Sequence, residues 1–132
     1  MKIAVLFYST YGHNYAMAAA AAESLVASGI EADLLRIPET LSDEILGKMG
    51  ALDAQKAFSD VQLAEVEKLP DYDGFIFSFP TRFGNMPAQV KTFVDATGGL
   101  WQEGALIGKP FGLIAGSATQ HGGQESTLLT SM

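Results

Sequence analysis

The fold is decided near the start of the chain, where residues 3–14 read Ile3-Ala4-Val5-Leu6-Phe7-Tyr8-Ser9-Thr10-Tyr11-Gly12-His13-Asn14. The first five residues are apolar, with branched and aromatic types among them, which is typical of a parallel strand buried on both faces. The polar turn that follows leads into an alanine-rich stretch, His13–Ser28, which predicts a helix that ends at Gly29. A buried strand, a polar turn and a helix in this order indicate an α/β protein.

Later segments repeat this pattern. Phe75–Phe79 and Phe111–Ala115 are short apolar runs that also predict strands buried on both faces, and the more polar Ala32–Ile37 predicts an outer strand. Met86–Ala96 carries the apolar spacing of an amphipathic helix. The alternation of strands and helices predicts one α/β domain over residues 1–132, with a doubly wound sheet.

Two segments extend beyond a minimal version of that plan. The polar stretch Ile37–Asp73 has room for short helices around Ser42–Met49 and Val61–Leu69, with a mobile segment near Ala51–Asp60. Gln124–Met132 predicts the first turns of a further helix. A doubly wound domain normally continues with a fifth strand and a closing helix, so we expect the domain to be incomplete at its C-terminus.

Composition excludes several classes of function. The chain has 132 residues, 48% of them hydrophobic, and its 15 acidic and 8 basic side chains give a formal charge of −7. Such a chain disfavours binding to nucleic acid and to anionic membranes, and no apolar run approaches the roughly 20 residues of a membrane span. The absence of cysteine excludes disulfides, thiol nucleophiles and cysteine-bound zinc. The apolar start lacks a signal-peptide cleavage site, so we expect a cytoplasmic protein.

Polar, glycine-bearing loops follow three of the predicted strands. In an open parallel sheet these loops meet at the carboxyl edge, where ligands bind. The first loop, Tyr8–Asn14, places hydroxyl groups and a glycine before a helix, which suits a phosphate group, although Ser9 and Thr10 could instead simply cap the helix. This loop is neither a Walker A motif nor a GxGxxG fingerprint, which argues against ATP and a Rossmann-bound dinucleotide.

The other two loops add different chemistry. Pro80–Pro87 offers one arginine and hydrogen-bonding Thr and Asn side chains, which suit the polar edge of a flat heterocycle that becomes anionic on reduction. A rigid turn with a solvated Arg82 is the alternative. Gly116–Gln124 is the third such loop, and by itself it could be only a flexible linker. Three loops of this kind at one edge favour a binding site.

The residues of these loops resemble the WrbA family of flavodoxin-like NAD(P)H:quinone oxidoreductases. The motifs that carry the resemblance are Tyr8-Ser9-Thr10-Tyr11-Gly12-His13, Pro80-Thr81-Arg82-Phe83-Gly84-Asn85-Met86, Thr97-Gly98-Gly99-Leu100-Trp101 and Gly122-Gly123-Gln124-Glu125. The resemblance implies a flavodoxin-like sheet of order 2-1-3-4, with the fifth strand and last helix missing. It also implies FMN as cofactor, NADH or NADPH as co-substrate, a small quinone as acceptor, and a homotetramer.

The resemblance also implies the site residues. FMN would contact the residues of the three loops: Ser9, Thr10, Tyr11, Gly12, His13, Asn14, Pro80, Thr81, Arg82, Phe83, Gly84, Asn85, Ser117, Ala118, Thr119, Gln120, His121 and Gly122. Arg82 would offset negative charge on the reduced flavin, and Trp101 would form an aromatic platform over the cavity. The implied reaction is a two-electron ping-pong transfer of hydride from NAD(P)H through FMN to a quinone.

Remaining residues favour structural roles. No histidine or cysteine accompanies Asp71 and Asp73, so we expect no metal site. The acidic residues along 31–44 and 60–67 are interpreted as solvated faces. Two functional alternatives stay open: a flavodoxin that carries single electrons to a basic protein partner, and an interaction protein without catalysis.

Overall fold

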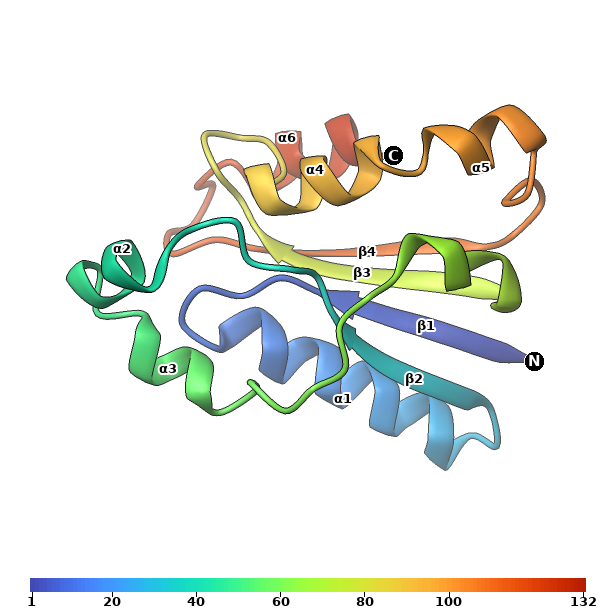
Figure 1. The fold of residues 1–132 in the computed structure, drawn as a ribbon, viewed down its shortest axis with the longest axis horizontal. Coiled ribbons are helices and arrows are strands. Elements are labelled where there is room, and N and C mark those ends of the chain that lie inside the picture. The colour runs from blue at the N-terminus through green and yellow to red at the C-terminus, as the bar shows by residue number, and fades with distance from the viewer.

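The structure is a computed structural model that describes residues 1–132, and it contains one four-stranded parallel sheet of order β2-β1-β3-β4 (Figure 1). The order predicted with the flavodoxin-like fold is therefore confirmed. The strands are β1 (Lys2–Phe7), β2 (Glu31–Arg36), β3 (Gly74–Pro80) and β4 (Phe111–Gly116). Because all four are parallel, their carboxyl ends lie at one edge of the sheet.

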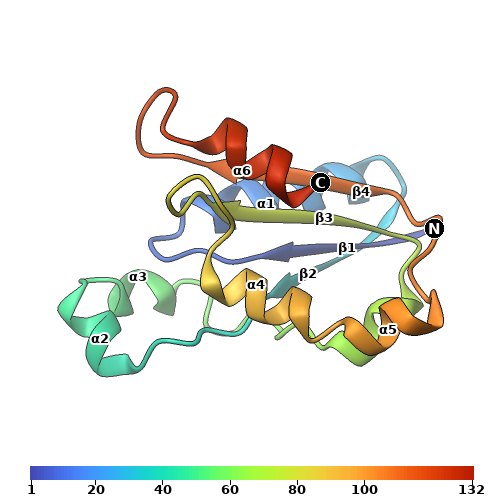
Figure 2. The same cartoon turned by 90° about the horizontal axis from the view of Figure 1, so that it is seen from above.

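Helices cover both faces of the sheet. Helix α1 packs on one face, while α4 and α6 lie on the other (Figures 1 and 2). The helices are α1 (His13–Ala27), α2 (Asp43–Lys48), α3 (Leu52–Lys56), the 3₁₀ helix η1 (Val66–Asp71), α4 (Ala88–Asp95), α5 (Gly98–Glu103) and α6 (Gln124–Ser131). None of them combines the length and the apolar character needed to cross a membrane.

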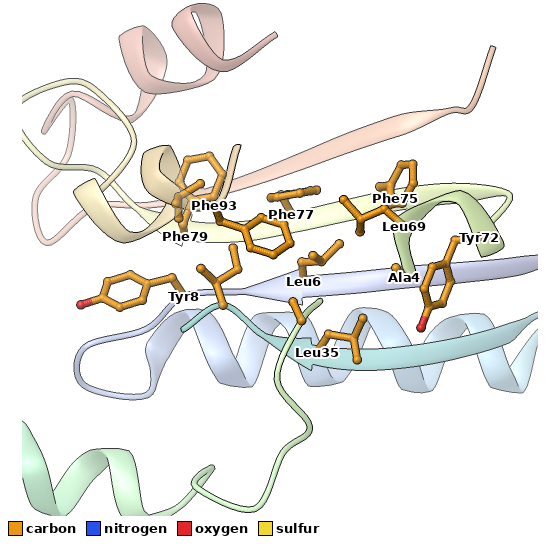
Figure 3. Packing of buried hydrophobic residues seen from close by; sticks show 13 residues of the cluster. Ala4, Leu6, Tyr8, Leu35, Leu69, Tyr72, Phe75, Phe77, Phe79 and Phe93 are labelled. Carbon is orange, nitrogen blue, oxygen red and sulfur yellow. The ribbon is translucent and has the colours of Figure 1, made fainter. Parts of the chain in front are cut away.

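Strand β1 divides the core into two halves. Alternate side chains of a strand point to opposite faces, so Leu6 joins the cluster under α4 whereas Val5 and Phe7 join the cluster under α1. Figure 3 shows the first cluster, in which phenylalanines of β3 pack over Leu6. The residues from Ala4 to Phe7 have no exposed surface, which confirms a strand buried on both faces.

Strand β4 differs from its prediction. It forms the edge of the sheet beside β3, and all of its residues keep some exposure, with Phe111 49% exposed. The sequence predicted burial on both faces, and this was wrong because one side of β4 has no neighbouring strand in this chain. The polar β2 forms the opposite edge, as predicted.

The segment between β2 and β3 also corrects the sequence analysis. Helix α2 is confirmed, and Ser42 Oγ caps it by accepting the amide of Ile45. The stretch predicted to be mobile contains α3, and it is fixed by Phe58, whose ring packs on Phe7 and Tyr15 at centroid distances of 5.6 and 5.1 Å. The short helix predicted around Val61–Leu69 is present only in its second half, as the 3₁₀ helix η1 from Val66, because Leu63 forms a parallel bridge to β2 instead.

Helix α4 matches its prediction, but the segment after it does not. Residues 98–103 form helix α5, whereas the resemblance implied that Trp101 lies over the cavity. Helix α4 runs from the carboxyl edge of the sheet to the amino edge, so α5 lies near the start of β4 (Figure 2). Trp101 is consequently held on a helix at the amino edge.

The close packing of α1 gives a test of the core. Ala18 is fully buried against the sheet, whereas Ala20 on the same helix is exposed. Ala18→Leu should lower the free energy of unfolding by about 1–3 kcal/mol, because the extra volume must displace packed neighbours. The matched change Ala20→Leu should stay within about 0.5 kcal/mol of the native chain. Urea denaturation of both variants measures the difference, and equal stability would contradict this packing.

Candidate functional site

The first loop is shaped by its own hydrogen bonds. Ser9 Oγ accepts the amide of Gly12 at 2.9 Å, and Gly12 has a φ of +96° that favours glycine. Gly12 is the N-cap of α1, and no side chain caps this helix. The alternative in which Ser9 and Thr10 cap the helix was therefore wrong. The first-turn amides of α1 have no partner one turn earlier, so they are available to an anion.

Asn14 fastens the start of α1 to the sheet. Its Nδ2 donates to Ser78 Oγ at 3.2 Å, and that hydroxyl donates to the Asn14 carbonyl at 3.0 Å. Both residues are buried. Tyr11 extends in the other direction, where its hydroxyl donates to the carbonyl of Met49 at 3.1 Å. The first loop is thus tied to β3 on one side and to the end of α2 on the other.

The second loop reverses direction sharply after β3. The backbones of Arg82 and Asn85 exchange two hydrogen bonds of 2.8 and 3.0 Å, and the two residues between them, Phe83 and Gly84, both have positive φ. Positive φ at both central positions is the feature of a type I′ turn, and it strains a phenylalanine. The Phe83 ring is fully exposed at the rim of the site.

Arg82 joins the second loop to the first. Its Nη2 donates to Thr10 Oγ1 at 2.8 Å, and its Nη1 donates to the carbonyl of Thr81 at 3.0 Å. Thr10 is buried, so one end of this bridge is fixed. The guanidinium consequently lies between the loops that follow β1 and β3, which supports the interpretation that Arg82 belongs to a binding site.

The third loop is closed by tight packing around a glycine. Ser117 Oγ accepts the amide of Thr119, at 3.3 Å, and donates to its carbonyl, at 2.9 Å. A Cβ on Gly122 would lie 2.0 Å from that Ser117 hydroxyl oxygen, so a side chain cannot fit while the loop keeps this shape. His121 turns away to Glu125, with 2.7 Å between its Nδ1 and the carboxylate.

Helix α6 holds the second loop through residues that the sequence analysis did not identify. Thr81 Oγ1 lies 2.6 Å from Thr127 Oγ1, and Ser126 Oγ donates to the Gly84 carbonyl at 3.0 Å. Thr127 has no exposed surface. Hydroxyl residues in the first turn of a helix after Gly122-Gly123 were the available signal, but their partners lie about forty residues away in sequence.

The three loops enclose a cavity of about 880 Å³ at the carboxyl edge of the sheet. The predicted site residues that line it are Ser9, Thr10, Tyr11, His13, Asn14, Pro80, Thr81, Arg82, Phe83, Ser117, Ala118, Thr119 and Gly122. Met17, Ala115 and Gly116 also line it and were not predicted. Predicted residues outside the lining are Gly12, Gly84, Asn85, Gln120 and His121, which lie within the same loops, and Trp101, which is remote from them.

The electrostatic character of this cavity differs from that of the chain. Arg82 is the one arginine or lysine in its lining, and no aspartate or glutamate lines it. Together with the uncapped start of α1, this gives a positive environment inside a protein of net charge −7. The cavity is suited to an anion and large enough for a cofactor-sized molecule.

Two other features carry no such site. A cavity of about 240 Å³ beside α4 is lined mostly by apolar side chains of β3, β4 and α4, and it is partly open to solvent because Val94 and Phe111 in its lining are exposed. No group of three histidine, aspartate or glutamate side chains is arranged to hold a metal ion.

Comparison with known proteins agrees with this architecture. The family described as NADPH-dependent FMN reductase matches residues 1–130. The chain belongs to this family. Proteins named NAD(P)H dehydrogenase (quinone) from Geobacter metallireducens and Geobacter sulfurreducens are 55% and 53% identical to it, each over 98% of the chain. The chain spans 64% of the length of both relatives.

Solved structures place the FMN reductase family member among flavodoxin-like folds. A WrbA-like flavodoxin from Agrobacterium tumefaciens is 28% identical, with a TM-score of 0.69 over 98% of this chain and 68% of that one. A flavodoxin from Pseudomonas aeruginosa is 26% identical, with a TM-score of 0.53 over 86% of this chain and 59% of that one. The resemblance to the WrbA family is thereby confirmed.

Two glycines of β4, Gly116 in the cavity lining and Gly112 outside it, provide a test of the packing between β4 and Asn14. A Cβ at position 116 would lie 2.8 Å from Asn14 Oδ1, whereas a Cβ at position 112 would make only ordinary contacts beyond 3.5 Å. Gly116→Ala should cost about 1–3 kcal/mol of unfolding free energy, because the Asn14 amide must leave its buried partner Ser78. Gly112→Ala should be neutral or slightly stabilising. Thermal unfolding compares them, and a Gly116→Ala variant as stable as Gly112→Ala would refute the Asn14 contact.

Proposed function

We propose that this chain forms the flavin-binding part of an FMN-dependent NAD(P)H:quinone oxidoreductase. The observation that carries the proposal is the cavity at the carboxyl edge, where Arg82 and the uncapped start of α1 converge and carboxylates are absent. The family match and the names of the most similar relatives support the same activity. Bound FMN would supply the redox chemistry, accepting hydride from NAD(P)H and delivering it to a quinone.

The residues of the cavity fit the parts of FMN. The phosphate would lie at the first turn of α1, where Ser9 and Thr10 add hydroxyl groups and His13 lines the opening. The ring system and ribityl chain would lie along the second and third loops. Arg82 would offset negative charge on the reduced cofactor, and its two existing hydrogen bonds hold it in place before any ligand arrives.

The second and third loops would control access to the flavin ring. The exposed Phe83 at the rim and the third loop from Ser117 to Gly122 would border the space in which nicotinamide and quinone bind in turn. Such ping-pong exchange needs one open face above the cofactor and no protein nucleophile. The cavity lining contains no serine–histidine–carboxylate arrangement, in agreement with that requirement.

Trp101 lies too far from the cavity of its own chain to contact a ligand there, so its proposed role needs a second copy of the chain. Its indole is 83% exposed on α5, at the edge of the sheet opposite the cavity. Ile107, which follows in the same connection, is 84% exposed. We propose that copies associate, as the tetramers of the WrbA family do, so that Trp101 of one copy would provide an aromatic platform at the cavity of another.

Arg82→Ala tests the cofactor assignment. Loss of one charged donor from a partly enclosed site should weaken FMN binding by about 1.5–3 kcal/mol, which raises the Kd by roughly 10- to 150-fold. Lys91→Ala is the matched control, because it also removes one positive charge but lies on exposed α4 outside the cavity. Quenching of flavin fluorescence gives both affinities. Equal affinities for the two variants, or preferential binding of FAD by the native chain, would refute the assignment.

Measuring quinone reduction distinguishes the proposed oxidoreductase from a flavodoxin-type electron carrier. With FMN bound, the native protein should oxidise NADH or NADPH in the presence of benzoquinone. Trp101→Ala should leave FMN affinity unchanged and lower kcat/KM several-fold to about tenfold, because aromatic stacking contributes about 0.5–1.5 kcal/mol. Unchanged kinetics would remove Trp101 from the site. FMN binding without any quinone reduction would favour the flavodoxin-type carrier instead.

A further inference from the structure

Glu39 is an acidic residue that the sequence analysis assigned to a solvated face, and the structure places it elsewhere. It lies in the connection between β2 and α2, and its carboxylate accepts five hydrogen bonds from four segments of the chain. The donors are Tyr8 OH (3.0 Å), Gln55 Nε2 (3.0 Å), Gln89 Nε2 (2.7 Å) and the amides of Thr40 (2.9 Å) and Leu41 (3.1 Å).

These donors stabilise the charge of Glu39 without a cation. No lysine or arginine forms an ion pair with it, and Gln55 and Gln89 are buried side chains. Burial alone would raise the pKa of Glu39, but the hydrogen bonds from Gln55, Leu41, Gln89 and Thr40 hold that pKa below its ordinary value. Glu39 is therefore an anion fixed in one orientation.

A chain of hydrogen bonds leads from this anion to the cavity. Tyr8 donates to Glu39, and Figure 3 shows its hydroxyl pointing out of the apolar cluster. Thr10 Oγ1 donates to the Tyr8 hydroxyl at 3.5 Å, the longest link, and accepts from Arg82 Nη2 at 2.8 Å. Each hydroxyl donates toward Glu39, so the series begins at a guanidinium and ends at a carboxylate. Tyr8 and Thr10 are both buried.

We propose that Glu39 is a positioning residue that orients Arg82 through Tyr8 and Thr10. The ionised Glu39 carboxylate can only accept hydrogen bonds, so the Tyr8 hydroxyl must donate its proton to it. The Tyr8 oxygen can then only accept, from the Thr10 hydroxyl, and the Thr10 oxygen in turn accepts from Arg82. The guanidinium is thereby held across the cavity before a ligand binds, and a preorganised donor loses less freedom on binding. The consequence for FMN rests on the proposed function, but the consequence for Arg82 does not.

Three variants separate this role from a general effect on stability. Glu39→Gln removes the negative charge and places an amide NH₂ group among Tyr8, Gln55 and Gln89, which all donate to the native carboxylate. Tyr8→Phe breaks the series in the middle and leaves the contacts of Glu39 with Gln55 and Gln89 intact. Gln55→Ala is the control, because it removes another donor to the same carboxylate oxygen but lies outside the series.

The first measurement needs no flavin. The chain contains two arginines, so Arg36→Lys assigns the Arg82 guanidinium signals in a nitrogen-15 spectrum. In Glu39→Gln and in Tyr8→Phe the Thr10 hydroxyl is no longer held toward Arg82. The exchange of the Arg82 guanidinium protons should then become faster, by up to the roughly tenfold effect of losing one hydrogen bond, and Gln55→Ala should leave it unchanged. If Tyr8→Phe leaves this exchange unchanged, the proposal is overturned, even where Glu39→Gln fails to fold.

The second measurement is a double-mutant cycle on FMN affinity. Glu39→Gln should raise the Kd for FMN about five- to tenfold in the native background and have no effect in the Arg82→Ala background. Equal effects in both backgrounds would show that Glu39 acts without Arg82 and would overturn the proposal. A native chain that binds no FMN would instead refute the proposed function, and the guanidinium exchange would still decide the role of Glu39.

Discussion

The parallel pairing of β1 with β3 is the contact on which the first two loops of the cavity depend. Its register sets Leu6 beside Phe77 and Phe7 beside Ser78, and the ladder continues with Tyr8, whose amide donates to the Ser78 carbonyl at 3.0 Å. The loops after β1 and β3 therefore leave the sheet side by side, and Asn14 can reach back to Ser78 from α1. Without this register, Arg82 and Thr10 would not meet.

Charge is distributed so that an acidic chain contains a cationic cavity. The carboxylates of the described ion pairs lie on exposed surfaces away from the cavity lining, which retains Arg82 and the open start of α1. The Glu39 carboxylate, behind the first loop, accepts hydrogen bonds only from neutral donors and is separated from Arg82 by Tyr8 and Thr10. An anion in the cavity consequently meets donors, while the negative exterior keeps other polyanions at a distance.

Chain direction divides the functional motifs between the two edges of the sheet. Helix α4 begins beside the cavity and carries the chain to the amino edge, so the motif that contains Trp101 emerges at the opposite end from Arg82. Trp101 therefore does not reach the cavity of its own chain, although its motif contributes to the family resemblance. Strand β4 forms one edge of the sheet and is partly exposed along its whole length.

The sequence by itself determined where the four strands lie along the chain, the helix from His13, and the three polar loops, because side-chain periodicity and turn chemistry are local properties. It also indicated most of the residues that line the cavity, since parallel strands bring their following loops to one edge. Tertiary structure alone decided the anchoring of α3 by Phe58, the contact of Thr127 with Thr81, and the inward turn of Glu39. Each of these depends on a partner that is distant in sequence, and a pattern of neighbouring residues carries no information about such a partner until the chain has folded.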